Sequence, residues 1–153
     1  MTATKKPGQK ALGRGELVSR GRTLVTTRLE RVGCTVEPPT KRGEPFSVRT
    51  PSAQALEMYV STQRVGGYVF WPKRRFTPAI NLLAAVVLLV DAPEPDLYLI
   101  PSTEWLDAKP PFTDRDNIGK RSEPEYGISV ARSSLPALEP FLWTESAANR
   151  ILR

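Results

Sequence analysis

The chain has 153 residues, 40% of them hydrophobic and 25% charged, and its net charge of +6 is compatible with a single globular domain with a basic surface. Histidine is absent, which excludes Ser-His-Asp and Cys-His catalysis as well as any histidine-ligated metal. The single cysteine, Cys34, excludes an internal disulfide and a zinc site, so we expect a reducing, cytoplasmic location and a buried thiol.

The first segments of the chain predict a basic arm and a helix. Residues 1–12 are polar and basic, and no apolar stretch follows them, which predicts a disordered arm and no signal peptide. Residues 15–32 place apolar side chains at helical spacing, and Gly33 is a typical residue just beyond a helix C-terminus. Gly21, in the middle of this helix, costs about 1 kcal/mol relative to alanine. A close approach of the helix backbone to a sheet would explain it.

Three strands are predicted after the helix. Segments 34–37 and 45–49 are short, whereas residues 55–62 show the clearest alternation of apolar and polar side chains. Glycines at positions 66 and 67 predict a turn, after which residues 68–71 return as the hairpin partner of the third strand.

The longest apolar run, residues 80–90, predicts a buried strand that pairs with residues 97–100. It is shorter than the roughly 20 residues of a membrane span, so no membrane association is expected. The remaining elements are expected to be a helical turn at 101–106 capped by Ser102 or Thr103, a polar loop at 107–126, a strand at 127–130, a helix capped by Ser133 or Ser134, and a helical tail at 144–153.

Positive charge is concentrated in the first part of the chain. Residues 1–90 contain 15 Lys and Arg against 5 Asp and Glu, whereas residues 91–153 contain 7 against 11. A basic surface of this kind neutralises phosphates and releases their counterions. The aromatic side chains of residues 68–71 could stack on bases or pack in the core. The residues expected to contact nucleic acid are Arg20, Lys41, Arg42, Lys73, Arg74 and Arg75.

The order of these elements predicts an α/β or α+β domain over residues 13–143, built as a three-layer sandwich. It resembles the PD-(D/E)XK, or restriction-endonuclease-like, nuclease superfamily. The similar features are Gly15 and Glu16 at the start of the helix, the strand end at residues 96–102, and residues 124–128 before a serine-capped helix. The resemblance implies a mixed central sheet flanked by helices.

The resemblance also implies where catalytic residues would lie. In that superfamily an Asp and a Glu or Gln hold divalent ions, and a lysine orients the attacking water and stabilises the developing charge. These positions fall on Ser47, Tyr59 and Ser61 in this chain. If Glu57 is taken as the acid, Tyr59 takes the lysine position, so the lysine is missing in either alignment. We therefore expect an impaired enzyme without a cofactor, and Glu16 and Glu57 are only weak candidates for metal ligands.

Two other functions remain open from the sequence. Glu16, Glu44 or Glu57 could form a rebuilt site with Lys41 or Lys73, in an active endonuclease that depends on magnesium or manganese. The chain could instead be a protein-interaction module or a homodimer whose basic charge is incidental. A cation site is also conceivable in the acidic loop, although a solvated loop is favoured there; its acids are Asp114, Asp116, Glu123 and Glu125.

Overall fold

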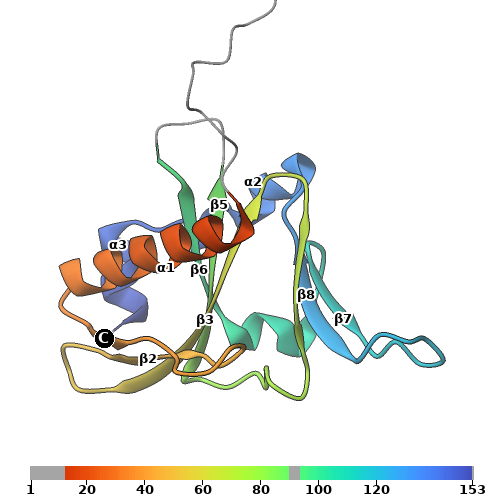
Figure 1. Ribbon diagram of the computed structural model, residues 1–153, viewed down its shortest axis with the longest axis horizontal. Coiled ribbons are helices and arrows are strands. Elements are labelled where there is room, and N and C mark those ends of the chain that lie inside the picture. The colour runs from red at the N-terminus through yellow and green to blue at the C-terminus, as the bar shows by residue number, and fades with distance from the viewer. Residues whose placement is uncertain (1–12, 90–93, 153) are drawn as a thin grey trace, which may run out of the picture.

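The computed structural model describes residues 13–89 and 94–152, so the arm expected at residues 1–12 lies outside it. Within these ranges a five-stranded mixed sheet and a three-stranded antiparallel sheet are combined with three α-helices and short 3-10 turns (Figure 1). The domain is therefore of the mixed α+β kind. None of the described helices is long and apolar enough to cross a membrane.

Helix α1 (Arg14–Arg31) occupies the predicted position and buries Gly21, Val25 and Leu29, which are spaced four residues apart on one face. A Cβ atom at Gly21 would overlap the hydroxyl of Thr62 on strand β3 (Ala55–Arg64). The glycine thus permits the close approach to the sheet that the sequence predicts. Gly33 follows the helix with a φ of +89°, a conformation that favours glycine, as predicted for the helix end.

The larger sheet has the strand order β1-β2-β3-β5-β6. Strands β1 (Thr35–Glu37), β2 (Phe46–Arg49) and β3 lie at the three predicted positions and form an antiparallel series. Strand β5 (Leu82–Leu89) is parallel to β3, and β6 (Asp96–Pro101) is antiparallel to β5. The predicted pairing of the apolar run with residues 97–100 is confirmed.

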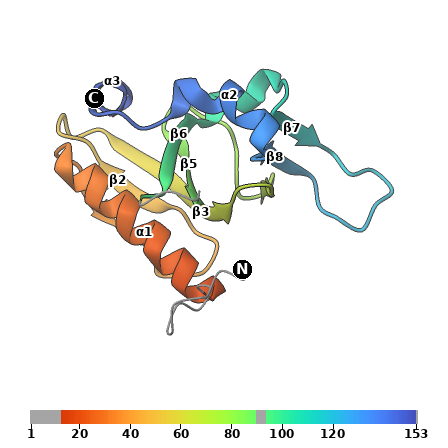
Figure 2. The ribbon, with the colours of Figure 1, turned by 90° about the horizontal axis from the view of Figure 1, so that it is seen from above.

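The core lies on both faces of this sheet. On one face Leu56 and Met58 pack against α1 and α3 (Glu145–Ile151), together with buried Cys34, whose thiol pKa is raised by burial. On the other face the buried cluster includes Trp105 and residues of the second sheet. Figure 2 shows α1 on one side of the larger sheet and β7 and β8 beyond the other. Helices therefore cover one face, whereas a sheet and short helical turns cover the second.

The second sheet corrects the predicted hairpin. Strand β4 (Tyr68–Pro72) pairs with β8 (Glu125–Ser129), which pairs in turn with β7 (Phe112–Arg115). The expected pairing of residues 68–71 with residues 55–62 is therefore wrong, because β5 lies beside β3 instead. The chain does turn before β4, but it leaves the larger sheet there. Strand β7 lies inside the segment predicted as a polar loop, so that prediction is also wrong in part.

The helical segments differ from expectation at their ends. Ser102 does not cap the turn η1 (Ser102–Asp107); its hydroxyl donates to the Ala79 carbonyl and accepts from the Ala79 amide. Ser134 likewise caps no helix and donates to Ser129 Oγ. The expected last helix is divided into η2 (Arg132–Ser134), α2 (Leu135–Leu138) and η3 (Glu139–Phe141), since Pro140 cannot continue a helical hydrogen-bond ladder. Helix α3 is separate and is capped by Thr144 Oγ1, which accepts from Ala147 N at 3.0 Å.

Candidate nucleic-acid interface

Strand β3 extends beyond its neighbour β2. Strand β2 pairs with residues 55–58 of β3, whereas β5 pairs with residues 57–64. Among the described residues, the second half of β3 therefore has no strand on its β2 side. Two adjoining cavities of about 610 and 630 Å³ lie along this half, and they share Arg14, Arg22 and Val60 in their walls.

Arginine is the commonest residue in the walls of these two cavities, which we call the arginine groove. Helix α1 contributes two of the arginines, the loop before β2 one, the end of β3 one, and the segment after β4 two. Glu44 is the one acidic residue among the lining residues. The six arginines are Arg14, Arg22, Arg42, Arg64, Arg74 and Arg75.

Most of these guanidinium groups have no acidic partner in the part of the chain that the structure describes. Arg74 Nε donates to Glu123 Oε1 at 2.8 Å. For the other five, no ion pair with a carboxylate is formed inside the described ranges of the chain. Like charges gathered in this way repel one another. A bound anion would relieve that repulsion.

Arg75 is held in place by its backbone and by its neighbours. Its Nη1 donates to the Arg42 carbonyl at 3.3 Å, and a Cβ atom at Gly43 would overlap that same Nη1. Gly43 has a φ of +83°, so glycine is favoured there on both counts. The Tyr59 hydroxyl donates to the Arg75 carbonyl at 2.7 Å. Burial raises the pKa of this tyrosine, which keeps the phenol protonated as a donor.

The structure brings three of the expected nucleic-acid residues, Arg42, Arg74 and Arg75, into the groove. Arg20 and Lys41 are exposed and line neither cavity. Arg14, Arg22 and Arg64 were not among the expected contacts. The helical ones carry a usable signal, because residues 14, 18 and 22 are four apart and lie on one side of a helix.

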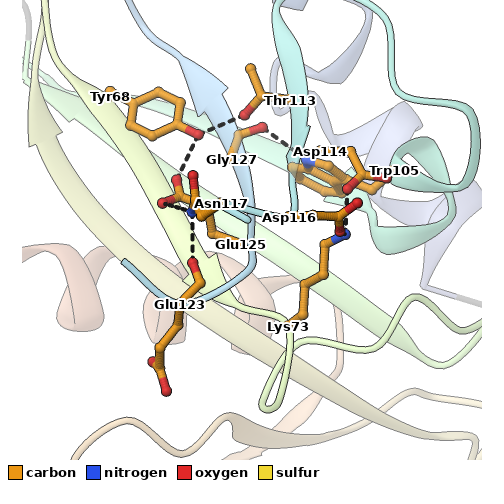
Figure 3. A network of polar contacts seen from close by, with 10 residues as sticks. All are labelled: Tyr68, Lys73, Trp105, Thr113, Asp114, Asp116, Asn117, Glu123, Glu125 and Gly127. Atoms are coloured by element: carbon orange, nitrogen blue, oxygen red, sulfur yellow. Dashed lines mark hydrogen bonds and ion pairs between the residues drawn. The ribbon is translucent and has the colours of Figure 1, made fainter. Parts of the chain in front are cut away.

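Lys73, by contrast, is paired with acidic side chains at the surface of the protein. Its ammonium group contacts Asp114 and lies 2.7 Å from Asp116 Oδ1 (Figure 3). It also lies over the Tyr126 ring, 4.7 Å from the ring centroid. The hydrogen bonds that it donates to the two aspartates raise its pKa above the ordinary lysine value. Two of the acids considered for a cation site therefore bind a lysine instead.

The other acidic residues of this region also have protein partners. Glu125 is buried, and its Oε2 accepts from the Tyr68 hydroxyl at 2.8 Å, while its Oε1 accepts from Asn117 Nδ2 at 3.3 Å (Figure 3). Burial is the largest cause of the raised pKa of Tyr68. Of the neighbouring aromatics, Trp71 is buried against Phe76, whereas Phe70 is exposed.

The positions of the degenerate nuclease site lie on one face of β2 and β3 but in different cavities. Ser47 and Glu57 are directly paired across the two strands and line a third cavity of about 410 Å³. Tyr59 and Ser61 line the arginine groove, and alternation places Tyr59 on the face opposite buried Met58, as predicted. Glu16 is exposed and lines none of these three cavities.

The three acids considered for a rebuilt site, Glu16, Glu44 and Glu57, are therefore not gathered at one point, although Glu37 lines the third cavity together with Glu57. Glu44 lines the groove and Glu57 the third cavity, while Glu16 lies outside both. Over residues 13–89 and 94–152 no three His, Cys, Asp or Glu side chains are grouped so that they could hold a metal ion. The groove instead provides hydrogen-bond donors for anions.

The chain was compared with known protein families, proteins and structures, and no relative was found. The likeness to the PD-(D/E)XK superfamily accordingly stays a resemblance of motifs and element order. No protein-family model, no curated protein and no solved structure matches the chain.

Proposed function

We propose that the chain binds nucleic acid through the arginine groove, as a PD-(D/E)XK-like protein with impaired catalysis. The supporting observation is the lining of six arginines, of which Arg74 alone has an acidic partner within the described residues. A guanidinium group donates two parallel hydrogen bonds to a phosphate and keeps its charge at any physiological pH.

A polyanion suits the groove better than a single small anion. The arginines come from four separate segments of the chain and line two adjoining cavities. A phosphodiester backbone carries a charge on every nucleotide, so several phosphates can contact several arginines at once. Each contact releases counterions, which makes the affinity depend on salt.

The residues at the expected catalytic positions support the proposal that catalysis is impaired. Ser47, Tyr59 and Ser61 stand where the resemblance places the acids and the lysine of a nuclease. Ser61 and Tyr59 line the arginine groove, so a nucleic acid bound there would meet a hydroxyl and a phenol instead. Binding without efficient cleavage is the expected result.

The test is a salt titration of binding to labelled duplex and single-stranded oligonucleotides, followed by fluorescence anisotropy. The slope of log affinity against log salt is about −0.9 for each phosphate contact on duplex DNA, and Arg22→Ser should reduce its magnitude by about 1. Arg22→Ser should also weaken binding to every sequence, since a phosphate contact carries no base information.

Arg150→Ser is the matched control, because Arg150 lies on α3 and lines neither cavity of the groove. It removes the same charge and should leave the slope unchanged. The proposal fails if the wild-type protein binds no nucleic acid at low salt, or if the two substitutions weaken binding equally.

A further inference from the structure

The hairpin of β7 and β8 extends from the body of the molecule. Its strands are paired from Phe112 with Ile128 to Arg115 with Glu125, and residues 116–124 connect them. Both ribbon views show this connection projecting beyond the neighbouring elements (Figures 1 and 2). We call residues 117–122 the hairpin tip.

The tip carries an apolar side chain between polar and basic neighbours. Ile118 is 89% exposed, although isoleucine is among the residues most often buried. Lys120 and Arg121 follow it in the same tip, and no acidic residue lies between Asp116 and Glu123. The tip is thus basic and apolar at once.

The connection between β7 and β8 is fixed in position by its polar contacts. Asn117 Nδ2 donates to the Glu123 carbonyl at 2.7 Å and to Glu125 Oε1 at 3.3 Å, which bridges the two sides of the connection (Figure 3). The Lys120 amide donates to the Asn117 carbonyl at 3.0 Å and closes the turn. These hydrogen bonds therefore fix the backbone on which Ile118 lies.

The acidic residues near the base of the hairpin form ion pairs with basic residues of the segment after β4. Asp114 and Asp116 hold Lys73, and Glu123 holds Arg74, which also lines the arginine groove. The base of the hairpin therefore adjoins the groove through Arg74. The charged residues of the tip, Lys120 and Arg121, are positive, as are the arginines of the groove.

We infer that the hairpin tip inserts Ile118 between two adjacent base pairs of a duplex whose backbone lies in the arginine groove. Proteins that unstack a base step use an apolar wedge of this kind, with basic residues beside it on the phosphates. Lys120 and Arg121 are the basic residues beside the wedge that contact the phosphates. This inference rests on the proposed nucleic-acid function, and it adds duplex deformation to it.

The experiment uses the full chain and a duplex with 2-aminopurine at successive positions, because the fluorescence of this base rises when it is unstacked. Wild-type protein should raise the fluorescence at one step. Ile118→Ala should abolish that rise and weaken duplex binding by about tenfold, as expected when most of a buried isoleucine contact is lost.

Ile80→Ala is the matched control, since Ile80 is 91% exposed in the loop before β5. It should retain both the fluorescence rise and the affinity. Circular dichroism spectra of both variants should equal that of the wild type, because each side chain lies on the surface.

The remaining outcomes separate this inference from the proposed function. If wild type and Ile118→Ala bind equally and neither unstacks the duplex, while Arg22→Ser still weakens binding, the insertion is wrong and the groove proposal stands. If wild type binds no nucleic acid at low salt, both fail. If Ile118 is instead required for binding to anionic phospholipid vesicles and not to a duplex, the tip contacts a membrane and the insertion is overturned.

Discussion

At the scale of single residues, the position of Arg75 depends on a glycine in another loop. Its guanidinium passes over Gly43, where the backbone has a φ of +83° and where a Cβ atom would overlap Arg75 Nη1. The same Nη1 donates to the Arg42 carbonyl. Two loops that are far apart in the sequence therefore meet at one wall of the arginine groove.

Gly43→Ala should weaken nucleic-acid binding without changing the charge of the protein. The added Cβ displaces Arg75 from the Arg42 carbonyl, and the left-handed backbone makes the variant less stable by about 1–2 kcal/mol. Anisotropy titration should show a several-fold loss of affinity.

Gly33→Ala is the control for this prediction, since Gly33 has a φ of +89° and lines neither cavity of the groove. Its loss of stability in a denaturant titration should be similar, and its affinity should equal that of the wild type. Equal affinities for Gly43→Ala and wild type would show that Arg75 is not a contact.

Residues with a local role could be predicted from the sequence. Gly33 ends a helix, so neighbouring residues alone indicate its role. Residues with a role across the fold could not be predicted in this way. Lys73 belongs to a triplet of basic residues, and its neutralisation depends on aspartates some forty positions later.

At the scale of elements, the predicted strands agree better with the structure than their predicted partners do. Alternation and apolar runs are properties of one segment, and they predicted β2, β3 and β5. Pairing depends on competition between segments that are distant in sequence. Strand β4 follows a glycine turn as a hairpin strand would, yet β5 pairs with β3 and leaves β4 to the second sheet.

Strand β7 was missed for the same reason. Only Phe112 is buried among its residues, whereas Asp114 and Arg115 are exposed, so the segment has the composition of a loop. The neighbouring β8 supplies the hydrogen bonds that make it a strand. The hairpin that carries Ile118 therefore could not be predicted from the pattern of apolar and polar residues.

The side-chain network between β4 and β8 gives a prediction about alkaline stability. The Tyr68 hydroxyl donates to Glu125 and also contacts Thr113 Oγ1 at 2.6 Å. Tyr68→Phe leaves the buried Glu125 carboxylate without this donor and should cost about 1–3 kcal/mol of unfolding free energy at neutral pH.

The pH dependence follows from the raised pKa of Tyr68, caused first by burial and then, among the raising effects, by Glu125. Because the folded pKa exceeds the unfolded value near 10, the stability from the neutral phenol is complete below that pH and is lost as pH rises through the folded pKa. Urea titrations across this range should show a steeper loss for wild type than for Tyr68→Phe. Parallel pH profiles would contradict the prediction.

At the scale of the whole molecule, the uneven charge of the sequence is partly cancelled by folding. The acidic second part supplies Asp114, Asp116 and Glu123 to Lys73 and Arg74, and Glu94 to Arg28 at 3.6 Å. Five of the arginines left without a carboxylate partner in the described part of the chain line the arginine groove. The excess of positive charge in residues 1–90 predicted a basic surface, but only the fold determines which arginines lack acidic partners.

The distribution of carboxylates over the molecule gives the last prediction, on cleavage. Two-metal phosphodiester hydrolysis requires acids that converge on one phosphate, whereas Glu16, Glu44 and Glu57 are divided between the surface, the groove and the third cavity. Supercoiled plasmid saturated with protein should therefore remain intact with magnesium or manganese. Glu57→Ala should behave as wild type does. Nicking that disappears both with EDTA and with Glu57→Ala would show instead that the acids are brought together when nucleic acid binds.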